Sequence, residues 1–238
     1  SNSGVSYDES YNIGLDLNSI ENFIVDEINI SDVQLLPPCE PSKIVGIALN
    51  YPGVGDSQSE LDEPLVFLKG LNSLVLDDVA LDVSPDTLAW GECELAVIIK
   101  HKIKNISVDD VHENILGFMP ANDITCNNLY KRDHHLAKSK SADGFCPVGK
   151  YIDLNYEYHN RKIQAFQNNI LIREGNTNDM IFSIEKIIKS LSKWMTLNPG
   201  DIILTGAPPR VREKQFLMPD DIYSVRVEGF ENLNIRVA

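Results

Sequence analysis

The 238-residue sequence is poor in cysteine, in basic side chains and in long apolar runs, and each shortage excludes a class of protein. Its four cysteines form no Cys-x-x-Cys pair and match no zinc-binding spacing, which argues against a disulfide scaffold or a structural zinc site. No stretch approaches the roughly 18 apolar residues of a membrane-spanning helix, and the first residues do not resemble a signal peptide. We therefore expect a reduced, cytoplasmic protein.

Basic residues are outnumbered, because 21 Lys and Arg face 35 Asp and Glu, for a formal net charge of −14. A field of this sign disfavours nonspecific binding to nucleic acid or to an anionic membrane. An anionic substrate would need a metal ion or a few well-placed cations to overcome that field locally. The hydrophobic fraction of 43% and the charged fraction of 24% are those of an ordinary globular protein.

Two regions differ along the chain. Residues 1–40 form an acidic, modestly hydrophobic segment that ends in a proline-rich connector, and we expect residues 41–238 to form the folded domain. Short apolar runs bounded by Gly, Pro or charge predict strands in this domain. The predicted strands are 44–49, 65–68, 95–99, 162–166, 202–205 and 222–227.

Only two segments predict helices. One begins at Ser107, an N-cap residue followed by Asp109 and Asp110, and runs to about Leu116. The other covers roughly 179–195, where apolar residues recur at spacings of three and four. Strands outnumber helices and do not alternate with them. The pattern therefore indicates a mainly β or α+β fold with one long packing helix, rather than a doubly wound sheet.

Glu92 and Glu94 stand at the start of an apolar strand and are the most informative local feature. Alternate residues of a strand project to the same side, so the two carboxylates are expected roughly 7 Å apart. They would repel each other unless a cation lay between them, and oxygen ligands of this kind suit Mg²⁺, Mn²⁺ or Ca²⁺. Spacing alone favours the plainer alternative, a solvated strand end with two surface glutamates.

Three further features are ambiguous when taken singly. Asp123 follows an apolar stretch at an expected strand end, where it could be a ligand, a helix cap or a turn former. Lys140 opens a turn-rich loop at 140–149, either as a solvated lysine or as a cation or acid of a site. The strand at 202–205 emerges into Thr205-Gly206, whose backbone N–H groups and hydroxyl could hold a carboxylate or form only a turn.

The order of these motifs is more specific than any one of them. From about residue 35 to residue 230 the chain resembles the fumarylacetoacetate hydrolase family, through Asn50-Tyr51, Glu92-x-Glu94, Asn122-Asp123, Lys140-x-x-Asp143-Gly144 and Thr205-Gly206-x-Pro208. Asp-Met-Ile-Phe at 179–182 and Met-Thr-Leu-Asn-Pro-Gly-Asp at 195–201 are its closest verbatim stretches. The chain looks especially similar to the 2-hydroxyhepta-2,4-diene-1,7-dioate isomerase / 5-oxopent-3-ene-1,2,5-tricarboxylate decarboxylase branch of aromatic catabolism.

The resemblance implies a mixed β-sandwich roll of the family's C-terminal-domain type around a divalent metal, usually in a homodimer. It implies Glu92, Glu94 and Asp123 as the ligands of Mg²⁺, or of Mn²⁺ or Ca²⁺. Lys140 is implied as the lysine that touches the substrate, a small anionic 2-oxo acid. The candidate substrate-binding residues are Tyr51, Arg173, Thr205 and Gly206.

The lid segment departs from the family pattern. In hydrolytic and decarboxylating relatives, a His and a Glu just after Asn-Tyr activate water or move protons. Here residues 52–60 contain no histidine, so Glu60 alone remains as a candidate catalytic acid. His134 and His135 could replace the missing histidine, although a solvated loop pair is the favoured interpretation.

Positions that read the substrate depart as well. The arginine that usually follows Asn-Asp is replaced by Asn127, and the glutamine usual before the long helix is replaced by Arg173. Arg173 would prefer an additional carboxylate on the substrate. The expected Thr-Gly-Thr is Thr-Gly-Ala at 205–207, with Arg210 and Arg212 close behind it. The metal positions are retained, whereas the groups that move protons and read the substrate are altered.

Three functions are compatible with these residues. The leading one is a divalent-metal-dependent isomerase that acts on a small enolisable 2-oxo or 2-hydroxydienoic dicarboxylate, because isomerisation relocates a proton and needs no activated water. The alternative is C–C hydrolysis of an acylpyruvate, as in fumarylacetoacetase, or decarboxylation of oxaloacetate. The third is a metal-binding family member without catalysis.

Overall fold

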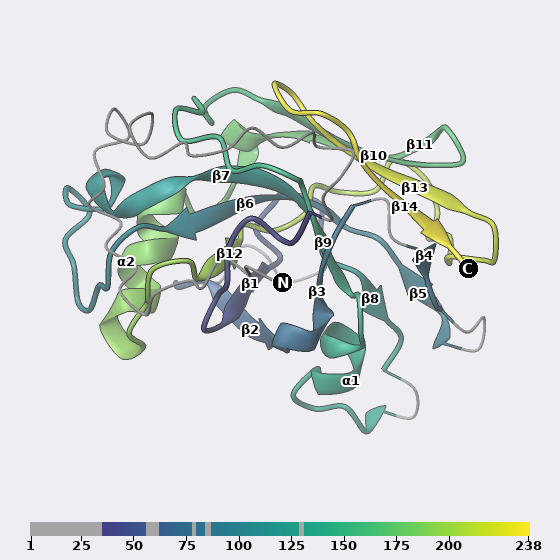
Figure 1. Cartoon of the computed structure of the whole chain (residues 1–238), viewed down its shortest axis with the longest axis horizontal. Coiled ribbons are helices and arrows are strands. Elements are labelled where there is room, and N and C mark those ends of the chain that lie inside the picture. The colour runs from purple at the N-terminus through teal and green to yellow at the C-terminus, as the bar shows by residue number, and fades with distance from the viewer. Residues whose placement is uncertain (1–34, 56–61, 78–79, 84–86, 129–130) are drawn as a thin grey trace, which may run out of the picture. The chain divides into compact units, whose positions relative to one another are not determined.

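A computed structural model describes residues 35–55, 62–77, 80–83, 87–128 and 131–238 (Figure 1). Most of the N-terminal segment predicted at 1–40 therefore lies outside the described residues, and so does the candidate acid Glu60. The domain boundary at residue 40 stays a prediction. Within the described part of the chain, no helix is both long enough and apolar enough to cross a membrane.

The larger sheet has seven strands in the order β2-β1-β12-β6-β7-β9-β3 (Figure 1). The pairs β1–β12 and β3–β9 are parallel and the other four pairs are antiparallel, so the sheet is mixed. Its strands are β1 (Ile44–Ala48), β2 (Leu65–Lys69), β3 (Leu74–Leu76), β6 (Cys93–Ile99), β7 (Ile115–Asn122), β9 (Cys146–Val148) and β12 (Ile202–Leu204).

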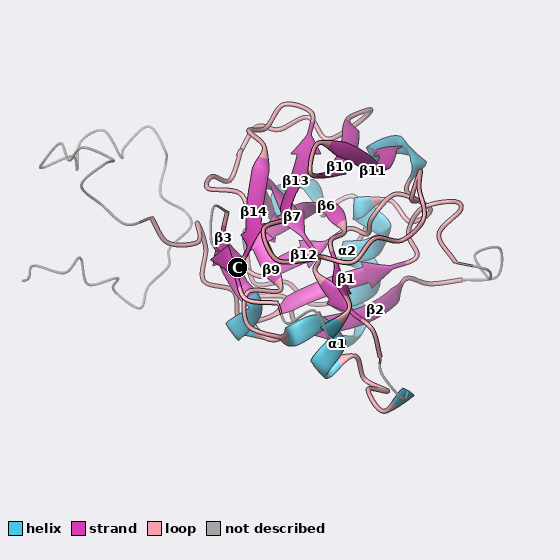
Figure 2. Ribbon diagram, turned by 90° about the vertical axis from the view of Figure 1, so that its right-hand side faces the viewer, coloured by secondary structure: helices cyan, strands magenta, loops and turns pink. Residues whose placement is uncertain are grey.

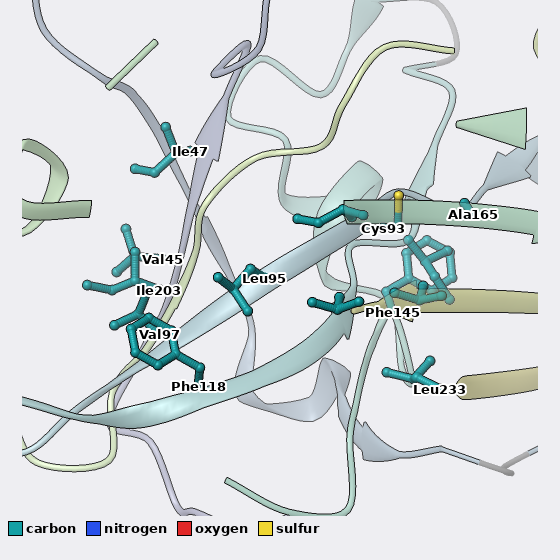
Figure 3. Packing of buried hydrophobic residues seen from close by; sticks show 14 of the residues in the cluster. Val45, Ile47, Cys93, Leu95, Val97, Phe118, Phe145, Ala165, Ile203 and Leu233 are labelled. Carbon is teal, nitrogen blue, oxygen red and sulfur yellow. The ribbon is translucent and has the colours of Figure 1, made fainter. Parts of the chain in front are cut away.

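Strand β6 lies at the centre of this sheet, and all seven of its residues are buried. Leu95 and Val97 face one apolar cluster, where Figure 3 shows them near Phe118 and Ile203. Ala96, on the other side of the strand, belongs to a second apolar cluster. The continuous apolar run in the sequence is thus explained by a strand that is covered on both faces.

The smaller sheet has five strands in the order β11-β10-β13-β14-β4, and a two-stranded sheet pairs β5 with β8. Ile163, Val225 and Leu233 of the smaller sheet pack in the same cluster as Leu95 of β6, which places the two sheets face to face (Figures 1 and 2). The bounds are β4 (Ala80–Leu81), β5 (Ala89–Trp90), β8 (Thr125–Cys126), β10 (Lys162–Gln167), β11 (Ile170–Asn176), β13 (Ile222–Val227) and β14 (Leu233–Val237). The prediction of a strand-dominated, mainly β or α+β fold is confirmed.

The long packing helix is α2 (Ile184–Trp194), and Ile187, Ile188 and Leu191 bury its apolar face in the main core. The predicted start near residue 179 was five residues too early. A 3₁₀ turn occupies Thr177–Asp179, and the α-helix begins only where the side chain of Ser183 accepts a hydrogen bond from the N–H of Lys186. Two caps in succession therefore divide one apolar pattern into two elements.

The helix predicted at 107–116 is wrong. The hydroxyl of Ser107 donates to the carboxylate of Asp110 across 2.8 Å and caps no helix. A short 3₁₀ turn at His112–Asn114 follows, and from Ile115 the chain continues as β7, the long antiparallel partner of β6. Pairing with a central strand outweighs a local cap signal here.

The loop predicted at 140–149 also contains regular structure. Lys140 lies in the short helix α1 (Ala137–Ser141), and strand β9 occupies Cys146–Val148. The six predicted strand regions coincide with β1, β2, β6, β10, β12 and β13.

Candidate active site

The pairing of β6 with β7 brings three carboxylates to one end of the larger sheet. Cys93 pairs with Asn122, so Glu92, just before β6, lies opposite Asp123, just after β7. The N–H of Asp123 donates to the carbonyl of Glu92 across 2.9 Å, which fixes this crossing. Glu94 and Asp123 are 2% and 1% exposed, and the side chain of Glu92 is 18% exposed. The surface-glutamate alternative is therefore wrong for Glu94.

Lys140 meets these carboxylates from helix α1. Its ammonium contacts the carboxylate of Asp123 and lies 3.3 Å from Oε2 of Glu92. It also donates to the hydroxyl of Thr125 across 2.6 Å, and that hydroxyl donates to Glu92 across 3.2 Å. Lys140 is 7% exposed, so the solvated-lysine alternative is wrong.

A second lysine, which the sequence did not single out, lies on the other side of Asp123. The Nζ of Lys69 is 2.6 Å from Oδ1 of Asp123 and donates to the carbonyl of Ile124 across 3.1 Å, with its side chain fully buried. Lys69 ends strand β2, two residues after the buried Phe67, and therefore projects to the same inner side. The alternation of residues along this strand was the sequence signal that could have placed Lys69 in the site.

Arg173 approaches Glu92 from strand β11 of the smaller sheet. Its Nη2 lies 2.5 Å from Oε1 of Glu92, and its Nη1 donates to the carbonyl of Pro208 across 2.6 Å. Arg173 is 1% exposed, although nothing in the sequence pattern indicates burial of a lone arginine on a strand. The Nη2 of Arg210 lies 3.9 Å from the same oxygen, Oε1 of Glu92.

The cations and the burial act in opposite directions on the carboxylates. Burial alone would raise the pKa of Glu92, but Lys140, Arg173 and Arg210 together lower it to about 2. Burial raises the pKa of Glu94 well above its ordinary value, and the carboxylates of Asp123 and Glu92 add to this more than Lys140 offsets. Glu92 therefore remains an anion, whereas burial and the neighbouring carboxylates disfavour the charged form of Glu94.

The residues after β12 line the site through their backbone. The N–H of Gly206 donates to Oε2 of Glu94 across 2.6 Å. The backbone after β12 therefore binds a carboxylate, as the sequence allowed, but this carboxylate belongs to the protein itself. The hydroxyl of Thr205 donates to the carbonyl of Leu95 across 2.8 Å, and Thr205 is fully buried. Gly206 has a φ of +99°, and an added Cβ would lie 2.7 Å from Cβ of Asn50. Only glycine fits this approach without strain.

Asn50 and Tyr51 close the site from the segment after β1, and both are fully buried. The amide of Asn50 donates to the carbonyls of Thr205, across 2.8 Å, and Phe182, across 3.1 Å. Burial is the largest cause of a raised pKa of Tyr51, followed by the nearby Cys93 and Glu94. The phenol therefore remains neutral beside the carboxylates.

The comparison with known proteins agrees with this architecture. The sequence profile described as fumarylacetoacetate (FAA) hydrolase C-terminal matches residues 43–238. The chain belongs to the fumarylacetoacetate hydrolase family.

Two members of the fumarylacetoacetate hydrolase family illustrate the range of similar proteins. The mitochondrial oxaloacetate tautomerase FAHD2A of Homo sapiens is 35% identical over 186 residues, which cover 74% of this chain and 59% of that protein. The 4-hydroxyphenylacetate degradation bifunctional isomerase/decarboxylase of Escherichia coli is 33% identical over 234 residues, which cover 92% of this chain and 52% of that protein. The chain thus spans little more than half the length of these two relatives.

A solved structure supports the same relationship. The 2-hydroxyhepta-2,4-diene-1,7-dioate isomerase of Mycobacterium marinum superposes with a TM-score of 0.79 at 29% identity, covering 90% of this chain and 81% of that one. The resemblance to the family, and to its isomerase and decarboxylase members in particular, is confirmed.

The donor chemistry of the site fits the divalent ion that the fumarylacetoacetate hydrolase family implies. Glu92, Glu94 and Asp123 offer the carboxylate oxygens that Mg²⁺, Mn²⁺ and Ca²⁺ prefer, and a cation would relieve the repulsion at Glu94. Among the described residues, no three acidic, His or Cys side chains already face one point as a ligand set. Lys140 and Lys69 contact the oxygens of Asp123 instead.

Histidine is absent from this group of residues. The chain has five histidines, and all of them are exposed, including His134 and His135 in the turn before α1. The nearest protein cations to the carboxylates are therefore lysine and arginine, which remain protonated at neutral pH.

Proposed function

We propose that the chain is a divalent-metal-dependent enzyme that relocates a proton on a small enolisable 2-oxo or 2-hydroxydienoic dicarboxylate, as an isomerase or tautomerase. The observation that carries the proposal is the buried ammonium of Lys140, which lies among Asp123, Glu92 and Thr125 while every histidine is exposed. Mg²⁺, Mn²⁺ or Ca²⁺ held by Glu92, Glu94 and Asp123 would supply a fixed positive charge for the substrate's oxygens.

Lys140 is suited to stabilise the oxygen that becomes negative when such a substrate ionises. Burial alone would lower the pKa of Lys140, but Asp123 and Glu92 raise it, so the ammonium remains charged. A fixed ammonium in a nearly dry site stabilises an enolate more than a solvated one would. Removal of such a hydrogen-bond donor typically reduces turnover by about 100- to 1000-fold.

The reaction is a balanced proton relocation. For a 2-hydroxy-2,4-diene, the O–H proton at C2 is released, the double bonds shift by one position, and C5 gains a proton. The product is the 2-oxo-3-ene, with no change in oxidation state and no loss of carbon. For an enol of a 2-oxo dicarboxylate, the same O–H proton leaves and C3 gains one. Glu60 remains the predicted acid for the carbon-bound proton, outside the described residues.

The absence of histidine favours this reaction over hydrolysis. C–C hydrolysis needs a water molecule that a general base deprotonates, and histidine is the side chain most often used. Proton relocation uses no water. The named activities of similar proteins, oxaloacetate tautomerase and 2-hydroxyhepta-2,4-diene-1,7-dioate isomerase, are both of this kind.

The proposal is tested by ultraviolet spectroscopy of the purified protein with Mg²⁺. The conjugated absorbance of 2-hydroxyhepta-2,4-dienedioate, or of the enol of oxaloacetate, should decay faster than in buffer. Glu92→Gln should abolish the acceleration, and Glu231→Gln, which alters an exposed glutamate, should preserve it. Unchanged decay with metal bound would contradict the proposal and favour a non-catalytic, metal-binding member of the family.

Decarboxylation or hydrolysis remains the second candidate, because the Escherichia coli relative is named as a bifunctional isomerase/decarboxylase. Pyruvate release from oxaloacetate or an acylpyruvate, measured with lactate dehydrogenase, would support it. Loss of that release in His134→Gln or His135→Gln would show that the substituted histidine takes the role of the lid histidine that this chain lacks. Homodimer formation stays a prediction, which light scattering after gel filtration tests.

A further inference from the structure

Beyond the carboxylate cluster, three cations lie in succession from the interior toward solvent. Arg173 is 1% exposed, the side chain of Arg210 is 26% exposed, and Lys214 is exposed. Within the described residues, Glu92 is the one carboxylate at salt-bridging distance from Arg173 and Arg210, and Lys214 has none. Because Glu92 also pairs with Lys140, this region carries more positive than negative charge.

Hydrogen-bond donors in this region lack acceptors. Among the described residues, Nε of Arg173 and Nη2 of Arg210 are buried without a hydrogen-bond partner. A buried donor without an acceptor costs free energy, and native sites seldom keep one unless a ligand satisfies it. Two guanidinium donors with nothing to donate to indicate an anion that belongs between them.

The backbone holds these cations in place. Arg210 forms an isolated antiparallel bridge with Arg173, and the next N–H, of Val211, donates to the carbonyl of Ile172 across 2.9 Å. The segment is anchored again where Leu217 donates to Ala89 across 2.7 Å. The arginines are therefore positioned by an extension of strand β11 and not by a free loop.

Trp90 supports the cations without neutralising them. The Nζ of Lys214 lies 3.6 Å from the centroid of the Trp90 ring, and the guanidinium of Arg210 lies 5.7 Å from it. An aromatic face attracts a cation through its quadrupole and leaves the positive charge available to an anion. A carboxylate at the same place would have cancelled it.

From this geometry we propose that Arg210, with Arg173 and Lys214, forms a subsite for the distal carboxylate of the substrate and makes the site selective for dicarboxylates. The inference rests on the proposed function, because the 2-oxo carboxylate end must lie at Glu92, Glu94, Asp123 and Lys140. A planar carboxylate matches the paired N–H groups of a guanidinium. The cations also provide the local field that a chain of net charge −14 needs in order to bind a dianion.

The experiment compares two stable acids of equal length that differ at one end. 2-Oxoglutarate has a carboxylate where 2-oxopentanoate has a methyl group. Binding to the protein with Mg²⁺ is measured by calorimetry, and turnover by exchange of the C3 protons in D₂O. We expect 2-oxoglutarate to bind about 10- to 100-fold more tightly, as a charge-assisted hydrogen bond predicts. Arg210→Gln should reduce this preference about tenfold and change 2-oxopentanoate binding less than about twofold.

Two further variants keep the test decisive. Arg212→Gln removes the same charge two residues away, from an exposed side chain that donates to the carbonyl of Leu171, and should keep the preference. If Arg210→Gln does not fold, Lys214→Gln, at an exposed position, should still reduce the preference about two- to threefold. An unchanged preference in both Arg210→Gln and Lys214→Gln, or no preference in the unsubstituted protein, would overturn the subsite.

Failure of the subsite and failure of the proposed function give different results. Accelerated C3 exchange without any preference for 2-oxoglutarate would overturn the subsite and leave the function standing. A preference that Arg210→Gln removes, without accelerated exchange in either acid, would support the subsite and contradict the function.

Discussion

Arg173 and Glu92 lie 81 positions apart in the sequence and are joined by an ion pair of 2.5 Å between Nη2 and Oε1. The pair links the edge of the smaller sheet to the carboxylate end of the larger one. Because Arg173 is 1% exposed, its charge is compensated by Glu92 and by the carbonyl of Pro208 rather than by water. The pair therefore contributes to the fold as well as to the electrostatics of the site.

Arg173→Gln should destabilise the protein. The variant removes a buried charge-assisted hydrogen bond, but Glu92 keeps Lys140 and Arg210 as partners. We expect the free energy of unfolding to fall by about 1.5–3 kcal/mol, less than for a fully orphaned buried charge. Urea unfolding followed by circular dichroism measures it, with Arg212→Gln as the exposed control. An unchanged urea midpoint would show that the pair makes no net contribution to the free energy of unfolding.

Lys140→Met should separate metal binding from catalysis. The ammonium of Lys140 lies against Asp123 and near Glu92, where it competes with a divalent cation for the same oxygens. We expect Mg²⁺ to bind more tightly to the variant in calorimetry, while proton relocation falls by about 100-fold or more. Lys138→Met, an exposed position on the same helix, is the matched control. Weaker Mg²⁺ binding in Lys140→Met would contradict the competition.

Much of the fold could be predicted because its strands are encoded locally. Runs such as Leu95 to Ile99 are apolar throughout, and their burial on both faces of β6 follows from that pattern. The segment after Ser107 was mispredicted because its cap signal is local, whereas the pairing that converts it to β7 depends on β6. Register between distant strands is not visible in one segment.

The carboxylates of the site and Lys140 were predictable from motif order, whereas Lys69 and the contact of Arg210 with Glu92 were not. Glu92, Glu94 and Asp123 occur in recognisable motifs, and β6–β7 pairing brings them together. Lys69 and Arg210 have no motif and reach the site through strand alternation and through a bridge to β11. The cations that lower the pKa of Glu92 are Lys140, Arg173 and Arg210, which come from three separate segments that only the tertiary structure brings together.

Glu185 should make the stability of the protein depend on pH in the acid range. Burial alone would raise the pKa of Glu185, but hydrogen bonds from Tyr158 and Ser183 and the nearby His112 lower it. A carboxyl whose pKa is lower in the folded state stabilises the fold above its unfolded pKa, and this stability is lost as the pH falls through the folded value. The excess stability over Glu185→Gln should therefore shrink from about pH 6 to about pH 3.

The measurement for Glu185 is a series of urea unfolding curves at stepped pH. Both proteins carry His112→Gln, so that the imidazole that lies 3.3 Å from Oε1 of Glu185 does not contribute to the comparison. Glu231→Gln in the same background removes an exposed carboxyl and should show no comparable trend. An excess stability that grows toward acid pH would reverse the sign and refute the assignment.

Asn50→Asp should destabilise the fold and the site, because the Asn50 side chain joins the segments at Thr205 and Phe182. The side-chain amide of Asn50 donates to the carbonyls of Thr205 and Phe182, and its oxygen accepts from the N–H of Phe182 across 2.8 Å. Aspartate keeps the acceptor but loses both donations and places a charge against the buried carbonyl of Thr205 and the partly buried carbonyl of Phe182. We expect a loss of about 2–4 kcal/mol in the free energy of unfolding, together with weaker substrate binding, because Thr205 leads into Gly206, which holds Glu94.

The control is Asn178→Asp, an exposed asparagine whose side-chain oxygen accepts from the N–H of Asn160 and which should remain stable. Equal stability of the two variants would show that the Asn50 amide does not join these segments energetically.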